Sequence, residues 1–269
     1  MKKWIAILMA ALMLMSLMAA CGADTDTEDG EADTTTKAPE GTTQGTEGTE
    51  GTEDTKPEGT DDIPTVDQDD IMSYADYMAA ELDTEVTVLC YIQATQSWWD
   101  NKITVYAADE DGAYFIYEMA CTQEEAEAMT TGAPILVTGT KTAWEGEVEI
   151  VDATFAFVAE MDAFVAVPKD LTDLLDSDEL INYQNQTVVF KDLTVKEISF
   201  KNNGGDDIYV TLTKDGKDYN FCVEVYLTGP ETEVYTTTAA LQVGDVVDIG
   251  CFLYWYQSMN PHIIDINVK

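Results

Sequence analysis

The feature that most constrains the fold is a repeat: the same series of predicted strands and one predicted helix occurs twice along the chain. In the first copy, alternating apolar residues predict strands at 86–94, 103–108, 114–119, 135–144 and 148–158, with a Glu- and Ala-rich helix at 122–131. The second copy predicts strands at 188–198, 208–213, 219–226, 246–256 and 263–268, with a helix at 232–242. This periodicity predicts two all-β domains of about 100 residues each.

Three strands, a helix and two strands is the order of the OB-fold, a five-stranded barrel. Matching positions support the repeat, and they pair Gly132 with Gly244, Gly139 with Gly250 and Trp144 with Trp255. Amphipathic segments at 71–81 and 171–180 open the two copies. We therefore predict an all-β fold with short helices, made of tandem OB-like barrels at 65–165 and 166–269.

The N-terminus has the pattern of an export signal. Lys2 and Lys3 precede an apolar run at 4–17, and small residues lead to Cys21, which gives a basic region, a hydrophobic region and a cleavage site. The run is shorter than the roughly 20 residues that span a bilayer, so a permanent membrane helix is the less favoured alternative. We predict a signal peptide at 1–20.

The segment that follows is polar and acidic. Residues 22–64 contain no Val, Leu, Phe, Trp, Tyr or Met, and they carry 14 Asp and Glu against two Lys. Such a segment cannot bury enough apolar surface to offset the entropy of ordering. We predict a disordered acidic linker at 21–64 that holds the barrels away from the membrane.

Several motifs together resemble a known family. Residues 18–21, Met-Ala-Ala-Cys, resemble the lipobox of bacterial lipoproteins, with Met where Leu is commoner. The chain as a whole resembles tandem OB-like surface lipoproteins of Gram-positive anaerobes. The other features that carry this resemblance are the acidic linker, the stretch 97–102, the Asp-Glu-Asp-Gly turn at 109–112 and the motifs at 254–256 and 260–263. The resemblance implies that Cys21 is acylated, for example with palmitate, and anchors an extracellular protein to the cell membrane. It implies no activity.

Charge and composition argue against several functions. Residues 65–269 carry nine Lys, no Arg and 38 Asp and Glu, a net charge of −29. Nucleic-acid binding draws affinity from cations that neutralise phosphates, so we expect no nucleic-acid partner.

Catalysis and metal binding are also not expected. His262 is the only histidine, which excludes a two-His zinc site and a Ser-His-Asp triad in the first copy, and its place beside Pro261 favours a structural role. The acidic turns at 109–112 and 202–207 fit turn chemistry better than Ca²⁺ ligation. We predict a protein that is not an enzyme and has no cofactor and no metal.

Four cysteines remain besides Cys21, namely Cys90, Cys121, Cys222 and Cys251. All lie in apolar, strand-like segments, where a free thiol behaves as a small buried hydrophobe. Four buried thiols are the favoured interpretation, and one disulfide within each half is the alternative in an extracellular protein.

Aromatic residues mark the predicted ligand site. OB barrels bind oligonucleotides or oligosaccharides on the face of strands two and three, between two loops. Trp98 and Trp99 fall in the first of these loops, and as neighbours on a strand they should point to opposite faces. Tyr254 and Tyr256 should face away from the second core. These four residues are our candidate ligand-binding residues.

Trp144 and Trp255 occupy matching positions on the core-facing side of their predicted strands, so they are predicted to be structural. We expect a membrane-anchored extracellular lipoprotein that binds an oligosaccharide, a wall fragment or a surface protein. The alternative function is a structural or assembly module with no small ligand.

Overall fold

The computed structural model describes residues 70–203 and 205–269. The predicted signal peptide at 1–20, the predicted lipid attachment at Cys21 and the acidic linker at 21–64 lie outside the described residues. Within the described part, no helix is long and apolar enough to cross a membrane.

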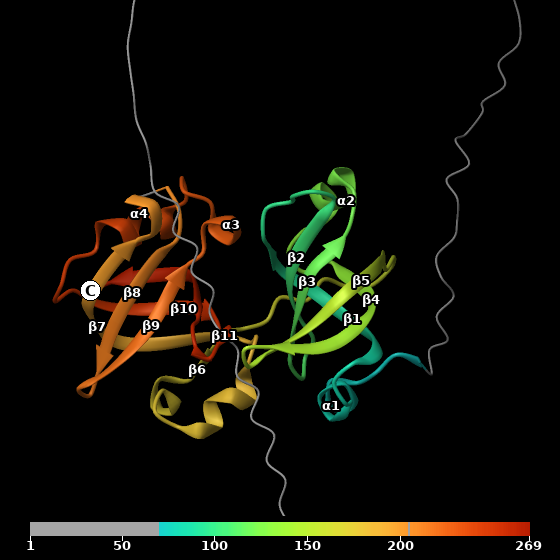
Figure 1. The fold of residues 1–269 in the computed structure, drawn as a ribbon, viewed down its shortest axis with the longest axis horizontal. Helices are drawn as coiled ribbons and strands as arrows, with labels where there is room; N and C mark the ends of the chain where they lie inside the picture. The colour runs from blue at the N-terminus through green and yellow to red at the C-terminus, as the bar shows by residue number, and fades with distance from the viewer. Residues whose placement is uncertain (1–69, 204) are drawn as a thin grey trace, which may run out of the picture. The chain divides into compact units, whose positions relative to one another are not determined.

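The first barrel is a closed ring of five strands in the order β1-β2-β3-β5-β4 (Figure 1). Its elements are β1 Thr84–Thr95, β2 Lys102–Ala108, β3 Ala113–Ala120, α2 Gln123–Ala128, β4 Pro134–Trp144 and β5 Glu147–Phe157. The ring closes through parallel pairing of β3 with β5, where Ile116 faces Ile150. The predicted all-β fold with short helices and a closed five-stranded barrel is confirmed.

Alternation along the strands fills this barrel. Every second residue at the start of β1 is buried, namely Val86, Val88, Cys90 and Ile92. Because successive side chains of a strand point to opposite faces, this period of two directs one face into the barrel.

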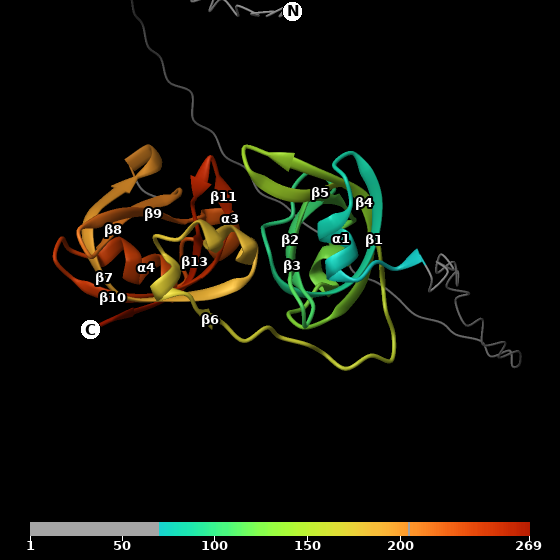
Figure 2. The same ribbon diagram turned by 90° about the horizontal axis from the view of Figure 1, so that it is seen from below.

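The helix α1, Tyr74–Ala79, covers one open end of the first barrel (Figure 2). Its Tyr77 side chain is buried in the first core. The Lys141 ammonium group of β4 donates to the carbonyl oxygens of Tyr77, Met78 and Ala80 at 2.8, 3.0 and 2.8 Å. Because the last carbonyls of a helix lack partners within the helix, this buried lysine caps α1.

The second sheet has the same pattern of pairing. Its elements are β6 Lys169–Asp170, η2 Thr172–Leu174, η3 Asp178–Tyr183, β7 Thr187–Phe200, η4 Lys201–Asn203, β8 Ile208–Lys214, β9 Lys217–Val223, α3 Val225–Thr228, α4 Glu233–Ala240, β10 Val246–Phe252, β11 Trp255–Tyr256, β12 Ser258–Met259 and β13 His262–Val268. Strand β10 pairs with both β13 and β7, so β7, β8, β9, β13 and β10 form a ring. Strands β9 and β13 are parallel, as β3 and β5 are in the first barrel.

Two predicted strands of this second barrel end early. The strand expected at 219–226 stops at Val223, because the Glu224 carboxylate accepts a hydrogen bond from the Tyr226 N–H at 3.3 Å and starts α3. The strand expected at 246–256 stops at Phe252, and residues 255–259 form the separate hairpin of β11 and β12. Both departures arise from hydrogen bonds that hydrophobic alternation does not encode.

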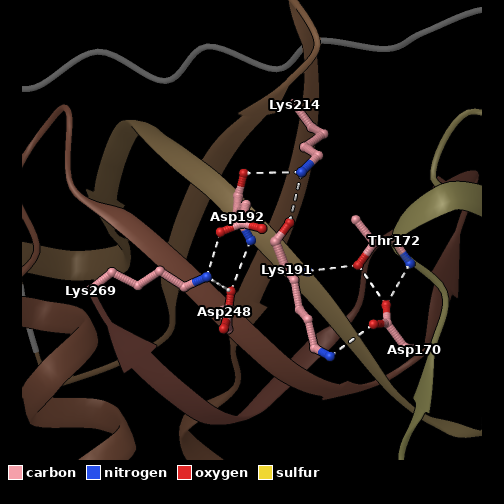
Figure 3. Close-up of polar contacts among 7 residues, drawn as sticks. All are labelled: Asp170, Thr172, Lys191, Asp192, Lys214, Asp248 and Lys269. Atoms are coloured by element: carbon pink, nitrogen blue, oxygen red, sulfur yellow. Dashed lines mark hydrogen bonds and ion pairs between the residues drawn. The ribbon is translucent and has the colours of Figure 1, made fainter.

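Strand β7 carries a bulge at Asp192, where φ is 55°. Charged side chains gather around it (Figure 3). The Lys269 ammonium group contacts the carboxylates of Asp192 and Asp248, and Lys214 donates to the main-chain oxygen of Lys191 at 3.1 Å. The Lys269 contacts tie the residue after β13 to β7 and β10, and the Lys214 contact ties β8 to β7; both roles are structural.

A third apolar cluster joins the two barrels. Tyr106 and Phe115 of the first barrel are buried with Phe252 of the second. The rings of Tyr106 and Phe252 stack with centroids 4.4 Å apart. The barrels therefore share a packed contact in addition to the chain that links them.

The four described cysteines are buried and free. Burial raises the pKa of Cys90 and Cys222 above the ordinary thiol range. Cys90 and Cys121 belong to the first core and Cys251 to the second, where a buried thiol acts as a small apolar residue.

Candidate ligand-binding groove

A groove of about 580 Å³ opens beside β2 and β3, at the loop that joins β1 to β2. Its lining residues are Gln96, Ser97, Trp98, Trp99, Lys102, Ile103, Thr104, Tyr117, Glu118 and Tyr226. Ligand sites in proteins commonly have volumes of about 300–1,000 Å³. We name this feature the aromatic groove, after Trp98, Trp99, Tyr117 and Tyr226.

Trp99 is the most exposed aromatic residue of the groove, at 79%. It lies in the predicted loop between β1 and β2, at a tight turn where its N–H and C=O pair with Lys102 at 3.0 and 2.9 Å. Asp100 and Asn101 form the turn, with φ of 48° and 60°. Positive φ at both central residues is the conformation of the turns that join two antiparallel strands tightly. The turn therefore presents Trp99 at the rim.

Trp98 has a different environment from Trp99. Its side chain is half-buried against the first core, and its indole N–H donates to the carbonyl oxygen of Cys121 at 3.1 Å. Trp98 is thus fixed by a hydrogen bond, whereas Trp99 is exposed to solvent.

A β-bulge shapes the opposite part of the groove. In β3, Tyr117 and Glu118 together face the single residue Thr104 of β2. Glu118 has φ of 48°, and its N–H donates to the Thr104 hydroxyl at 3.2 Å. The consecutive side chains of Tyr117 and Glu118 are therefore both exposed, where a regular strand would turn one of them inward.

Lys102 and Glu118 form an ion pair in the groove, with Nζ and Oε2 2.8 Å apart. The hydrogen bond from Lys102 lowers the pKa of Glu118, and the same contact raises the pKa of Lys102. Both groups are charged at neutral pH and neutralise one another.

The second barrel completes the groove through Tyr226, which is 61% exposed. The Ser97 N–H and hydroxyl both donate to the Tyr226 carbonyl oxygen, at 2.7 and 3.1 Å. Sequence reasoning missed Tyr226, because it was assigned to a strand, and missed Tyr117, because a bulge has no clear signal in a single sequence.

The other predicted ligand residues lie elsewhere. Tyr254 is half-buried between the barrels, where its ring stacks on His262 with centroids 4.4 Å apart. Tyr256 is exposed on the hairpin of β11 and β12. Neither residue lines the aromatic groove.

The prediction that Trp144 belongs to the core is wrong, because its side chain is 58% exposed. Trp144 is the last residue of β4 and pairs with Glu147 where the hairpin extends past the core. Trp255 is half-buried against the second core. Its ring also covers Gly146, where an added Cβ would lie 3.0 Å from the indole Cδ1.

The loops around these tryptophans contact one another. The Gln257 N–H donates to the Glu145 carbonyl oxygen at 2.6 Å, and its side-chain amide donates to the Glu145 carboxylate at 3.2 Å. No residue of the β4–β5 loop contributes to the described lining of the groove. The second wall expected from that loop is instead supplied by Tyr226.

Glu147 is a buried carboxyl group at the contact between the barrels. Its Oε2 accepts a hydrogen bond from the Trp255 N–H at 2.8 Å. Its Oε1 and the side-chain oxygen of Asn185 are both buried without a partner among the described residues. Burial raises the pKa of Glu147 to about 8, so the protonated form is favoured at neutral pH.

His262 is buried at the same contact. Its Nδ1 lies 2.6 Å from the Tyr106 hydroxyl. Burial lowers the pKa of His262 to about 4 and raises the pKa of Tyr106 well above its usual range. The hydrogen bond therefore joins a neutral hydroxyl and a neutral imidazole at pH 7.

The acidic turn at 109–112 is held by its own hydrogen bonds. The Asp109 carboxylate accepts from the N–H groups of Asp111 and Gly112 at 2.8 and 2.7 Å and from the Tyr114 hydroxyl at 2.7 Å. Among the residues that the structure describes, no group of three or more His, Cys, Asp or Glu side chains could hold a metal ion.

Comparison with solved structures gives distant matches. No family model matches the chain, and no curated protein matches it. A murine DNA-binding protein bound to double-stranded DNA matches with TM-score 0.34 and 9% identity, over 68% of this chain and 94% of that chain. The Ifi202 HINa domain in complex with double-stranded DNA matches with TM-score 0.32 and 11% identity, over 70% and 96%.

A replication protein A heterotrimer bound to single-stranded DNA matches with TM-score 0.29 and 10% identity, over 69% of this chain and 49% of that chain. Likenesses this distant do not say what this chain binds. These structures contain DNA, and the expectation of no nucleic-acid partner does not stand. The exclusion used the net charge of both barrels together, which does not give the local charge of the groove. Aromatic side chains also stack on nucleic-acid bases. That exclusion is withdrawn.

Proposed function

We propose that this chain is a lipid-anchored extracellular protein that is not an enzyme and binds its ligand in the aromatic groove. The ligand is an oligosaccharide, a wall fragment or another surface protein. The observation that carries the proposal is the gathering of Trp99, Tyr117 and Tyr226 in one groove with polar side chains. Rigid aromatic side chains with nearby hydrogen-bonding groups are typical of ligand sites.

The geometry of the groove supports binding rather than catalysis. Its ionised side chains, Lys102 and Glu118, are paired with each other. His262 lies outside the groove and is held neutral by burial. General acid–base chemistry needs a positioned group that exchanges a proton near the working pH. Neither the Lys102–Glu118 ion pair nor the buried, neutral His262 favours that exchange.

A structural or assembly module remains the second candidate. It draws on the shared apolar cluster of the barrels and on the exposed Trp144, which lies outside the groove.

Binding is tested by screening bacterial glycans, wall fragments and surface proteins against the unlipidated chain and two variants. Trp99→Ala should weaken capture, because it removes the most exposed ring of the groove. Trp144→Ala removes a similarly exposed ring elsewhere and should bind normally. Equal capture by the parent and both variants would assign the ligand to another surface, and loss in Trp144→Ala alone would favour the assembly function.

Anchoring is tested by metabolic labelling with a clickable palmitate analogue. The parent chain should carry the label and sediment with membranes, whereas Cys21→Ala should lose both properties. Cys121→Ala, which alters a buried thiol of the first core, should keep the label. An unlabelled parent chain would refute lipidation.

A further inference from the structure

The bulge in β3 exposes Glu118, which forms an ion pair with Lys102 in the groove. The bulge exposes Glu118 beside Tyr117, and it does so by placing Glu118 in a left-handed backbone conformation that non-glycine residues rarely adopt. Such conformations persist only where surrounding contacts hold them, and they gather at ligand sites. The Thr104 hydroxyl supplies one of those contacts.

The Lys102–Glu118 pair offers donors and acceptors at one place. Both side chains are about half exposed, at 48% and 45%, so a ligand can reach them. An ammonium group has three donors, and a carboxylate accepts about four hydrogen bonds. Two neighbouring hydroxyl groups of a sugar match this arrangement, because each hydroxyl both donates and accepts.

The aromatic rings beside the pair supply apolar surface. Trp99 is 79% exposed and Tyr117 is 43% exposed, and Tyr226 is held on the other side by its two hydrogen bonds from Ser97. A pyranose ring whose substituents are all equatorial has C–H bonds on both faces. Such a ring can stack on an aromatic side chain while its edge hydroxyls reach the charged pair.

Strand addition by a peptide does not fit this groove. Strand β2 pairs with β1 and β3, and β3 pairs with β2 and β5. Peptides that add a strand need an unpaired sheet edge, whereas β2 lies between β1 and β3, and Ile116 of β3 pairs with Ile150 of β5.

We propose that the aromatic groove binds an oligosaccharide of equatorially substituted pyranose units, with Lys102 and Glu118 holding adjacent hydroxyl groups and Trp99 stacking on a ring face. This inference rests on the proposed binding function and names the ligand class of the same groove. Tyr226 makes the site composite, since the second barrel supplies one wall.

The test is calorimetric titration of the full unlipidated chain with cellotetraose and tri-N-acetylchitotriose, whose rings carry equatorial substituents. At least one should bind with a Kd below about 1 mM. Trp99→Ala and Glu118→Gln should each weaken binding about tenfold, while Trp144→Ala should not. A β-1,4-linked galactotetraose, with its axial oxygen, should bind more weakly.

The outcomes separate this inference from the proposed function. If a peptide or a single-stranded oligonucleotide binds in a way that depends on Trp99, and neither sugar binds, the groove is still the binding site but the ligand is not an oligosaccharide. Sugar binding insensitive to Trp99→Ala and Glu118→Gln would overturn the groove. No binding of either sugar with a Kd below about 1 mM also overturns the sugar class. Unchanged melting temperatures of the two variants show that any loss is local.

Discussion

Replacing Glu147 with Gln should make the folded barrels more stable at alkaline pH. In the parent chain, burial raises the pKa of this carboxyl group to about 8 from a usual value of 4.5. The folded state then holds a proton that the unfolded state has released, so stability falls as pH rises between these two values. The fall is about 1.4 kcal/mol per pH unit for one group, or at most about 5 kcal/mol across the window.

Glutamine suits the site at every pH. Its side-chain oxygen can accept from the Trp255 N–H, as the Glu147 Oε2 does, and its amide has no charge to desolvate at any of these pH values. Below about pH 4.5 the variant and the parent should have similar free energies of unfolding. By pH 8 the variant should be more stable by several kcal/mol.

The assay is urea unfolding at intervals from pH 4 to 9, followed by tryptophan fluorescence. Glu149 is also buried with a raised pKa, and burial, with a smaller effect of the Glu147 charge, raises the pKa values of Tyr77, Tyr106 and Tyr254. The difference between parent and variant isolates Glu147 from these groups. Glu145→Gln, in the exposed turn of the same hairpin, is the matched control and should follow the parent. Parallel pH profiles of the parent and Glu147→Gln would refute a buried protonated Glu147.

Two other substitutions and one thiol measurement test the packing of the barrels. Lys141→Met removes the three hydrogen bonds that cap α1 and should cost about 2–4 kcal/mol of unfolding free energy in urea, whereas Lys196→Met, in an exposed ion pair, should cost less than about 1 kcal/mol; equal losses would contradict the cap. Gly139→Ala should cost about 1–3 kcal/mol, because its Cβ would lie 2.7 Å from the Ile150 Cγ2; an unchanged urea midpoint would contradict this packing. The four described thiols are buried and should react with a thiol reagent only on unfolding, so rapid labelling of the native chain would show that a core is open.

The sequence by itself predicted the all-β class and the order of the elements. Alternation of apolar residues and turn signals are local properties, so the strands of the first barrel differ from their predicted bounds by a residue or two. The aromatic loop at 98–99 was also found, because OB barrels place a ligand loop after the first strand.

Tertiary structure decided which of those aromatic residues form a site. Trp144 has the same local pattern as a core residue, yet it lies beyond the end of the barrel and is exposed. Tyr226 reaches the groove only because α3 of the second barrel contacts Ser97 of the first. The bulge that exposes Glu118 and the burial that protonates Glu147 likewise depend on partners far away in the chain. The alternation of apolar and polar residues determines which side of a strand is apolar, but only contacts between distant parts of the chain determine which residues pack against that side.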